Sequence, residues 1–483
     1  MIAVEPSRLL CVILLGLTLL AVWSGAGAQR PAPPIADWLR EAGIPAGELD
    51  LAVAIRPLDP RDGIAWQLDA ERPLNPASAM KLVTTWAALN LLGPQFRWRT
   101  TAHLGGPIVD GVLHGDLVLG GGGDPKLVSE DLGEWIARMR AAGLHEIRGD
   151  LVIDDVIFAP IDDTQASLDG ELTRPYNVQP SGALLNFKAT RLIVRPQAKG
   201  VAIELDPPLA DVLIDNRVRL RRERCRSGVS GLRISEPAAR HGVIATIRVD
   251  GLYSAGCGEQ GRFAAVLDHV AFARAFFAGA WRAAGGNWSG AARLDRGAAQ
   301  GEPWLEWRSP RTLAEVVDDV NHLSNNVMAR QLLLQLAAAR GVRPADAAAG
   351  RQAVVDWLAG RGLHFPGLVL DNGSGLSRTA RISATSLADL LVDAAATPLG
   401  ERFRQSLPLL GMTGTVRHRL VGDPLAGRAW LKTGSLDEVR SIAGYLEAAS
   451  GRRYVIVVLA NGARAPASVT VQDRLLRWLH QHG

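Results

Sequence analysis

Helix-like segments near both ends of this 483-residue chain enclose a long block of short β-like runs. An apolar helical stretch over residues 78–92 stops at Gly93, and helical periodicity returns after Arg311. Between about residues 98 and 305, short aliphatic runs such as 111–119 alternate with glycine-containing breaks. This order predicts one domain that is interrupted by a long β-rich insertion.

The composition is that of an ordinary globular protein. The 47% apolar and 21% charged residues exclude a disordered, collagenous or multi-span membrane chain. Lys and Arg (53) nearly balance Asp and Glu (49), so the chain is not a basic nucleic-acid-binding arm. At roughly 150 residues per domain, the length suggests about three domains, which disfavours a single small binding module.

The first residues predict export. Arg8 precedes an apolar run over residues 9–23, and Ala26-Gly27-Ala28 is typical of a signal-peptide cleavage site. The run is shorter than the roughly 20 residues that span a bilayer, so a cleavable signal peptide (residues 1–28) is favoured over a retained anchor. We therefore expect a periplasmic or exported protein, cleaved after Ala28, with at most a peripheral membrane contact.

Cleavage there would leave two cysteines, Cys225 and Cys257. An even pair in an oxidising compartment favours a disulfide, with two buried free thiols as the alternative. Neither cysteine has a ligand partner at metal-site spacing, so we expect no metal and no cofactor.

Three short motifs could carry chemistry, although each is weak when taken alone. Ser78-Ala79-Met80-Lys81 begins a helix, where positions i and i+3 share a face, so the lysine can serve as base for the serine. Ser324-Asn325-Asn326 separates two helical stretches, and Lys432-Thr433-Gly434-Ser435 lies in a strand-like run. Helix caps and an exposed strand end are the ordinary alternatives.

Together and in this order, the motifs resemble the signature of penicillin-recognising serine acyltransferases. The segment from Leu74 to Thr85 is similar to the active-site segment of class C low-molecular-mass penicillin-binding proteins, the D-alanyl-D-alanine carboxypeptidase/endopeptidase family. Further similar segments are Gly115-Asp116-Leu117, Gly123-Asp124-Pro125, Gly149 to Asp154, Gly373 to Arg378 and Lys432 to Leu436. The resemblance covers nearly the whole chain after the predicted signal peptide.

The resemblance implies a multi-domain α+β protein. A β-lactamase/transpeptidase-like α/β domain, with an antiparallel sheet and helices, would be interrupted by a β-rich insert of two nested domains. The 246 positions between Ser78 and Ser324 agree, because the excess over a compact β-lactamase is the β-rich block. The expected domains are 29–98 with 305–483 (catalytic), 99–165 with 258–304 (first insert) and 166–257 (nested insert).

It also implies a serine-type D-alanyl-D-alanine carboxypeptidase, and an endopeptidase, acting on peptidoglycan stem peptides or cross-links. Ser78 would form an acyl-enzyme, with Lys81 as its base, and β-lactam antibiotics would acylate the same serine. Ser324 would relay a proton toward the leaving amine, Lys432 would assist electrostatically, and Asn326 would hydrogen-bond the substrate amide.

Substrate contacts follow from the same resemblance. Lys432 and Thr433 would hold the terminal carboxylate beside Gly434, and the backbone N–H groups of Ser78 and Ser435 would form the oxyanion hole. Arg378 would lie near the site. Asp154 and Phe158 would reach it from the insert to meet the amine of the stem peptide, with a simple turn carboxylate as the alternative for Asp154.

Two rival functions remain. A β-lactamase or esterase on the same scaffold is disfavoured because no deacylating glutamate motif follows Ser324. A catalytically silent envelope scaffold is disfavoured because the motif residues are intact. The alternating Arg217, Arg219 and Arg221 predict an exposed strand face, with contact to anionic envelope polymers as the alternative. No sequence signal fixes the oligomeric state.

Overall fold

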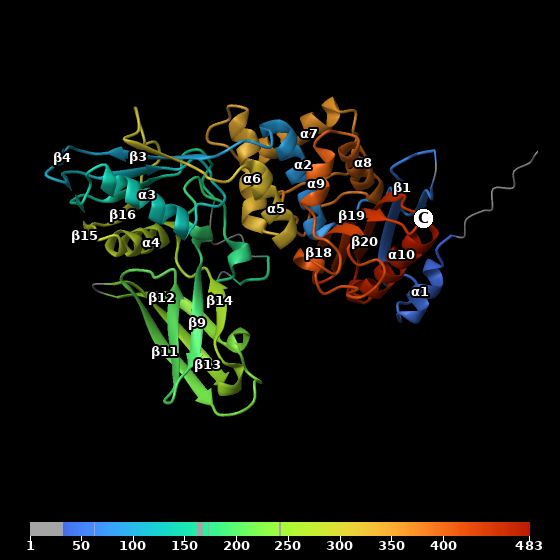
Figure 1. Cartoon of the computed structure of the whole chain (residues 1–483), viewed down its shortest axis with the longest axis horizontal. Helices are drawn as coiled ribbons and strands as arrows, with labels where there is room; N and C mark the ends of the chain where they lie inside the picture. Colours follow the sequence, from blue (N-terminus) through green and yellow to red (C-terminus); the bar gives the residue numbers. More distant parts are fainter. Residues whose placement is uncertain (1–31, 62, 162–167, 172, 241–242) are drawn as a thin grey trace, which may run out of the picture.

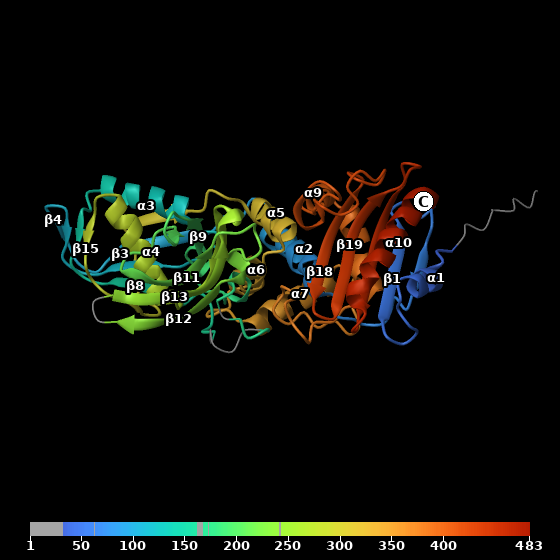
Figure 2. The same ribbon diagram turned by 90° about the horizontal axis from the view of Figure 1, so that it is seen from below.

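The computed structural model describes residues 32–61, 63–161, 168–171, 173–240 and 243–483. The predicted signal peptide lies outside the described residues. Figures 1 and 2 show an elongated molecule, with a helix-covered sheet at one end and a second body of strands and helices at the other. A β lobe projects to one side of that second body (Figure 1). Within the described ranges, no helix is both long and apolar enough to cross a membrane.

The sheet at the first end joins the two ends of the chain. It is antiparallel, in the order β18-β19-β20-β1-β2. Strand β1 pairs with β20 along its whole length, from the Asp50–Asn461 pair to the Pro57–Tyr454 pair. The strands are β1 (Asp50–Pro57), β2 (Trp66–Leu68), β18 (Ala429–Leu436), β19 (Val439–Glu447) and β20 (Arg453–Asn461).

Both faces of this sheet are buried, which explains why β20 is an almost continuous apolar run. Val455, Val457 and Leu459 face the helical cluster, whereas alternate residues such as Ile456 and Val458 face the opposite layer. Helices α1 (Ile35–Glu41) and α10 (Ser468–His482) supply that opposite layer. The helical cluster contains α2 (Lys81–Leu92), α5 (Leu313–Leu323), α6 (Asn326–Ala339), α7 (Ala347–Gly360), α8 (Ala384–Ala395) and α9 (Gly400–Gln405).

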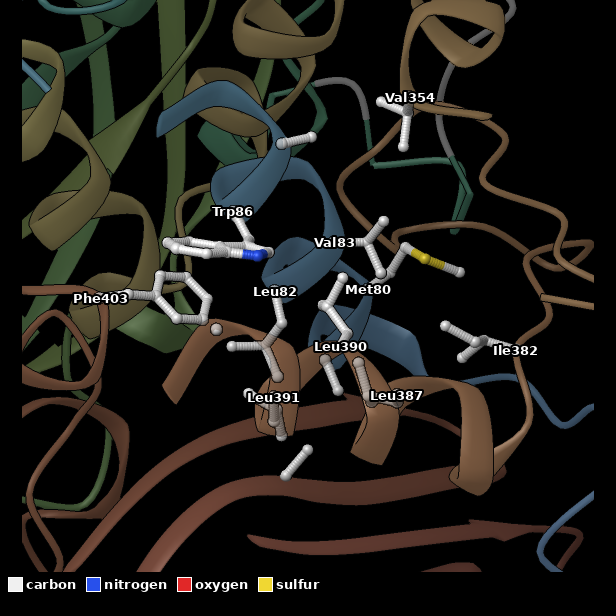
Figure 3. Close-up of a cluster of buried hydrophobic side chains, with 14 of the residues drawn as sticks. Met80, Leu82, Val83, Trp86, Val354, Ile382, Leu387, Leu390, Leu391 and Phe403 are labelled. Carbon is white, nitrogen blue, oxygen red and sulfur yellow. The ribbon is translucent and has the colours of Figure 1, made fainter. Parts of the chain in front are cut away.

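Helix α2 lies at the centre of the helical cluster. Its first nine residues, Lys81 to Leu89, are all buried. Trp86 packs on Phe403 of α9 with ring centroids 5.0 Å apart, and Leu82 lies among the leucines of α8 (Figure 3). A helix enclosed on all sides gives the turn at its N-terminus little freedom to move.

The second body is built from segments far apart in the sequence. Its five-stranded sheet has the order β16-β8-β6-β3-β17, so the chain re-enters it after the β lobe. A four-stranded sheet, β15-β7-β5-β4, and helices α3 (Ser129–Ala141) and α4 (His269–Ala283) complete it. The strands are β3 (Arg99–Leu104), β4 (Ile108–Val109), β5 (Val112–Leu113), β6 (Leu117–Gly120), β7 (Glu146–Ile147), β8 (Leu151–Asp154), β15 (Asn287–Trp288), β16 (Ala292–Leu294) and β17 (Leu305–Arg308).

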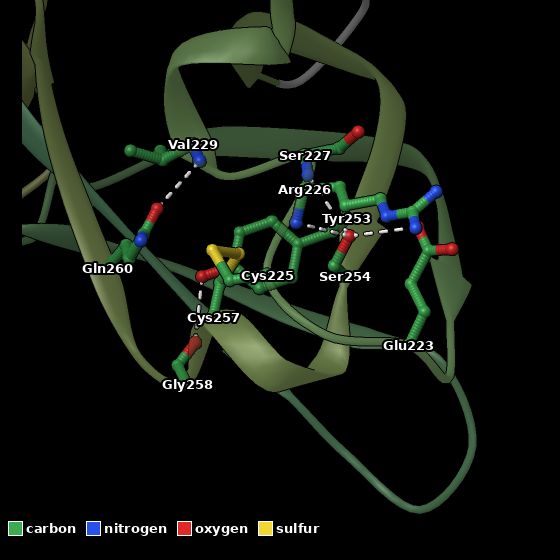
Figure 4. The surroundings of a disulfide bond; sticks show 10 residues. All are labelled: Glu223, Cys225, Arg226, Ser227, Val229, Tyr253, Ser254, Cys257, Gly258 and Gln260. Atoms are coloured by element: carbon green, nitrogen blue, oxygen red, sulfur yellow. Dashed lines mark hydrogen bonds between the residues drawn. A yellow bond between two sulfur atoms is a disulfide. The ribbon is translucent and has the colours of Figure 1, made fainter.

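The β lobe consists of two three-stranded sheets, β10-β9-β14 and β11-β13-β12. Cys225 and Cys257 form a disulfide beside the ends of β11 and β13 (Figure 4). Ser254 Oγ accepts hydrogen bonds from two backbone N–H groups of the turn that follows Cys225, which ties this turn to β13. The strands are β9 (Thr190–Pro196), β10 (Val201–Asp206), β11 (Val212–Arg221), β12 (Arg233–Arg240), β13 (Val243–Ser254) and β14 (Gln260–Ala264).

The predicted α+β class, with an antiparallel sheet and helices and a long β-rich insertion, is confirmed. Two strand pairings bear on the expected domain boundaries. Strand β14 follows residue 257 but pairs with β9 in the lobe, and β17 begins at residue 305 but pairs with β3 in the second body. We therefore propose domain boundaries near residues 264 and 308, where no sheet is divided.

Candidate active site

Ser78 lies in a 3₁₀ turn, Ala77–Met80, that leads directly into α2. The preceding residue, Ala77, has a φ of +44°, in the left-handed region that non-glycine residues rarely occupy. Two glycines press on this turn: a Cβ on Gly375 would lie 1.8 Å from Ala77 O, and one on Gly434 would lie 2.4 Å from Pro76 O. These close contacts hold Ala77 in a backbone conformation that is costly by itself, and they thereby fix the turn that carries Ser78.

The Lys81 amine is fully buried and has three partners. Its Nζ lies 2.8 Å from Ser78 Oγ, 2.6 Å from Asn326 Oδ1 and 2.6 Å from the carbonyl oxygen of Ser374. Burial, together with the positive charges of Lys432 and Arg330, lowers the pKa of Lys81 well below its ordinary value of 10.5.

A neutral amine has two N–H groups and one lone pair. Asn326 Oδ1 and the Ser374 carbonyl can only accept, so they take the two N–H groups of neutral Lys81. The lone pair is then left for Ser78, whose hydroxyl donates to it. This arrangement is the one that a base for Ser78 requires.

Ser324 lies just outside α5 because its backbone conformation is not helical. It ends α5 in the left-handed conformation, with φ 58° and ψ 37°. The next residue, Asn325, caps α6 by accepting a hydrogen bond from Met328 N. Lys432 Nζ on β18 donates to Ser324 Oγ at 2.9 Å and to the Thr433 carbonyl at 2.9 Å. Burial lowers the pKa of Lys432 to about 7.

A cavity of about 760 Å³ opens in front of these groups. Ser78, Ser324 and Asn326 line it from the helical side, and Ser435 lines it from β18. The strand closely approaches the nucleophile, because a Cβ on Gly434 would lie 2.9 Å from Ser78 N. The remaining walls include Arg378, Arg381, Asp437, Glu438 and, from the segment before β9, Leu168, Asp169 and Tyr176.

The structure thus brings together the motif residues that the sequence singled out. Lys81 and Lys432 lie behind the cavity wall with their amines on Ser78 and Ser324. Thr433 is half-buried on β18 and shares a hydrogen bond of 2.8 Å with Thr415 Oγ1. Arg378 lines the cavity and donates to the Leu168 carbonyl at 3.1 Å.

The structure does not bring Asp154 and Phe158 to this cavity. The Asp154 carboxylate ends β8, is buried, and accepts from the backbone N–H groups of Val156, Gly297 and Ala299. Phe158 packs in a small cluster with Leu334 and other apolar residues of α6. Asp154 has the contacts of a turn carboxylate, and the end of β8 borders a different cavity from the one that holds Ser78.

Asp169 and Tyr176, which no sequence motif singled out, line the cavity where Asp154 and Phe158 were expected. Tyr176 OH donates to Asp169 Oδ2 at 2.5 Å, and Asn326 Nδ2 donates to the Tyr176 carbonyl at 3.4 Å. Burial and the nearby Asp169 raise the pKa of Tyr176 to about 12, so its hydroxyl keeps its proton. The chain has only four tyrosines, and the one that directly follows Pro175 was a sequence signal that could have been used.

Helix α6 holds this cavity wall in place. The buried Arg330 donates to the Val178 carbonyl at 3.2 Å. The next residue of α6, Gln331, accepts from Ser181 N and donates to Ser181 O through its side-chain amide, both at 3.0 Å. The helix that begins with Asn326 therefore also fixes the segment that carries Tyr176.

Comparisons with known proteins identify the family of the chain. A family model described as the D-Ala-D-Ala carboxypeptidase 3 (S13) family matches residues 42–482. The chain is 30% identical over 440 residues to a D-alanyl-D-alanine carboxypeptidase of Actinomadura sp. (strain R39), covering 84% of this chain and 77% of that protein. It is 26% identical over 395 residues to D-alanyl-D-alanine carboxypeptidase DacB of Haemophilus influenzae, covering 80% of each.

Solved structures show the same fold. Penicillin binding protein 4 (dacB) from Haemophilus influenzae superposes with a TM-score of 0.76 at 24% identity, covering 93% of this chain and 99% of that one. A predatory peptidoglycan endopeptidase from Bdellovibrio bacteriovorus gives a TM-score of 0.51 at 15% identity, covering 90% of this chain and 94% of that one.

Proposed function

Because this chain belongs to the D-Ala-D-Ala carboxypeptidase 3 (S13) family, we propose that it hydrolyses the bond between the terminal D-alanines of peptidoglycan stem peptides through an acyl-Ser78 intermediate. The chain is a serine-type D-alanyl-D-alanine carboxypeptidase, as the match to this family over residues 42–482 shows. One observation carries the residue assignment: Ser78 Oγ lines a large cavity and lies 2.8 Å from the buried Lys81 amine.

Acylation begins with the proton of the Ser78 hydroxyl, which passes to the lone pair of Lys81. The Ser78 oxygen attacks the carbonyl carbon between the two D-alanines, and the carbonyl oxygen becomes an oxyanion. The backbone N–H groups of Ser78 and Ser435 are the proposed donors to that oxyanion. Such a donor contributes about 3–4 kcal/mol to transition-state stability.

The leaving D-alanine needs a proton on its nitrogen, and this is the proton that Lys81 took from Ser78. Ser324 is the proposed relay, because its hydroxyl already accepts from the Lys432 amine and faces the same cavity as Ser78. The C–N bond breaks as the proton arrives, D-alanine leaves as an amine, and Ser78 keeps the acyl group as an ester. Water then attacks the ester, which restores the Ser78 hydroxyl and releases the shortened peptide.

The proposed substrate contacts lie at two sides of the cavity. Lys432 and Thr433 would attract the terminal carboxylate on one side, close to Ser324. On the other side, Arg378 and Asp169 offer a cation and an anion to the charged groups of the stem peptide. The cavity of about 760 Å³ is larger than a D-alanine dipeptide needs, which favours endopeptidase action on cross-links as well.

Peptidoglycan peptides are the substrate class, and β-lactam antibiotics bind this family. We propose that they acylate Ser78 as covalent inhibitors. We also propose that the protein is exported to the periplasm or beyond, with cleavage after Ala28.

The test is release of D-alanine from a soluble pentapeptide ending in D-Ala-D-Ala. The unchanged chain should release one D-alanine per peptide, and Ser78→Ala should release none above the uncatalysed rate. Rapid multiple-turnover hydrolysis of a chromogenic cephalosporin without D-alanine release would instead favour the β-lactamase alternative. If neither the peptide nor the cephalosporin is hydrolysed, the catalytically silent scaffold is favoured.

A further inference from the structure

The β lobe carries a dense cluster of positive charge that the proposed hydrolysis does not use. Residues 217–226, Arg-Val-Arg-Leu-Arg-Arg-Glu-Arg-Cys-Arg, contain six arginines and one glutamate. Their formal charge is +5, whereas the whole chain carries +4, so all other residues together sum to −1. We call residues 217–226 the cationic tip.

The arginines of β11 lie on its solvent face. Along this strand, Val218 and Leu220 pack against the lobe core, as do Val212 and Ile214. Because successive side chains of a strand point to opposite faces, Arg217, Arg219 and Arg221 form a row on the outer face, about 7 Å apart, and all three are exposed. The row contributes nothing to the core.

The cationic tip lies at the free end of the lobe. Strand β11 starts beside the second body, where Asp211 forms a bidentate ion pair with Arg282 of α4. The strand runs away from α4, since Arg222 at its far end donates to Ala198 O in the turn between β9 and β10. Figure 1 shows this lobe extending beyond the rest of the molecule. The Cys225–Cys257 disulfide fixes the turn that follows β11 (Figure 4).

The fold leaves most of this charge uncompensated. Among the described residues, Arg219, Arg221, Arg224 and Arg226 form no ion pair. Asp215 forms ion pairs with Arg217 and Arg248, so it does not neutralise the arginines that lie further along β11. The one acid inside the tip, Glu223, accepts a hydrogen bond from Ser254 Oγ. Like charges held this close repel one another, and an external anion would relieve the repulsion.

We propose that the cationic tip binds the anionic headgroups of a phospholipid membrane surface. Guanidinium groups match phosphate oxygens with paired hydrogen bonds, and basic clusters are attracted to anionic leaflets over about a Debye length. A projecting end reaches a flat surface without other parts of the molecule meeting it first, whereas a linear polymer is better held in a groove. Bound in this way, the enzyme would be a peripheral membrane protein with its active site away from the lipid.

The test compares sedimentation of the protein with vesicles of phosphatidylglycerol and phosphatidylcholine and with vesicles of phosphatidylcholine alone. The variant R219Q/R221Q/R224Q removes three charges from the tip. Its control, R40Q/R308Q/R343Q, removes three charges from exposed arginines elsewhere. Each basic residue near an anionic surface contributes a factor of about five, so the tip variant should need roughly a hundredfold more anionic lipid. The control variant should bind within a few-fold of the unchanged chain.

D-alanine release from a soluble peptide should be the same in all three proteins, which separates this surface from the active site. Added salt should weaken vesicle binding by the unchanged chain, because exposed charges are screened. Equal binding to neutral vesicles, or equal loss in both triple variants, would overturn the proposal. Binding to peptidoglycan sacculi through these arginines without vesicle binding would also overturn it, and would assign the tip to the polymer.

Discussion

The buried amine of Lys81 lies 2.6 Å from Asn326 Oδ1, although 245 positions separate the two residues in the sequence. The same Asn326 amide donates through its nitrogen to the Tyr176 carbonyl on the far wall of the cavity. One side chain therefore contacts both the proposed base and the segment that faces the substrate. This relationship links the chemistry of Ser78 to the shape of the cavity.

Lys81→Met should slow acylation by about 10²–10⁴-fold while leaving the fold intact. Among the residues that the structure describes, Lys81 supplies the one amine that contacts Ser78 Oγ, and general-base assistance accounts for about 10²–10⁴ in rate. Methionine fills a similar volume without a buried amine, so the thermal midpoint should not fall far. The rate of penicillin acylation and the circular dichroism melt measure the two effects. If the variant is acylated at a rate within tenfold of that of the unchanged chain, another base accepts the proton of the Ser78 hydroxyl.

Arg330→Met should move the acidic limb of the pH profile. The Arg330 charge helps to lower the pKa of Lys81, so its removal raises that pKa, and neutral Lys81 then appears only at higher pH. The ascending limb of kcat/KM should shift upward in pH. Arg330→Lys keeps the charge and should leave the limb near its original place. A purely structural role would reduce the rate at every pH without moving the limb.

Lys432 should make stability depend on pH in the alkaline range. Its pKa is about 7 in the folded protein instead of 10.5, so between these values the folded state binds fewer protons than the unfolded chain. The free energy of unfolding therefore rises as pH increases from about 7 to 10.5. Lys432→Met should flatten part of this rise in urea unfolding at pH 7, 8.5 and 10. An unchanged slope would show that Lys432 is not held neutral.

Asp169→Asn and Asp154→Asn should have opposite signatures. Asp169 lines the cavity, so its change should raise KM for a stem peptide several-fold and leave penicillin acylation unaltered. Asp154 accepts three backbone hydrogen bonds while buried, so its change should lower stability by about 1–3 kcal/mol without a matching effect on KM. Peptide kinetics and urea unfolding on both variants check the pair. The reverse pattern would indicate that Asp154, and not Asp169, contacts the substrate.

The catalytic motifs could be predicted because each is local. Ser78 and Lys81 are one helical turn apart, and Lys432 to Ser435 lie on one strand, so spacing alone brings their groups together. The wall at Tyr176 could not be predicted in this way. Its segment has no apolar period, and its position is set by side chains of α6 such as Arg330.

The insert was predicted in outline but not in detail. The run over residues 111–119 is divided into β5 and β6, which belong to different sheets, at the glycine that packs against Gly105. Strands of two residues, such as β4 and β7, are too short to show the alternation that marks a strand. The position expected for Asp154 differs from the observed one for a related reason. The motif indicates that Asp154 ends a strand, but it does not indicate which side of α6 that strand end borders.

Acylation of Ser78 is the step on which the proposed activity depends most directly. Purified protein and its Ser78→Ala variant would be incubated with a fluorescent penicillin, and intact mass with peptide mapping would locate the adduct. One adduct per chain on Ser78, absent from the variant, is the predicted result. No adduct, or an adduct of equal yield in Ser78→Ala, would contradict the account.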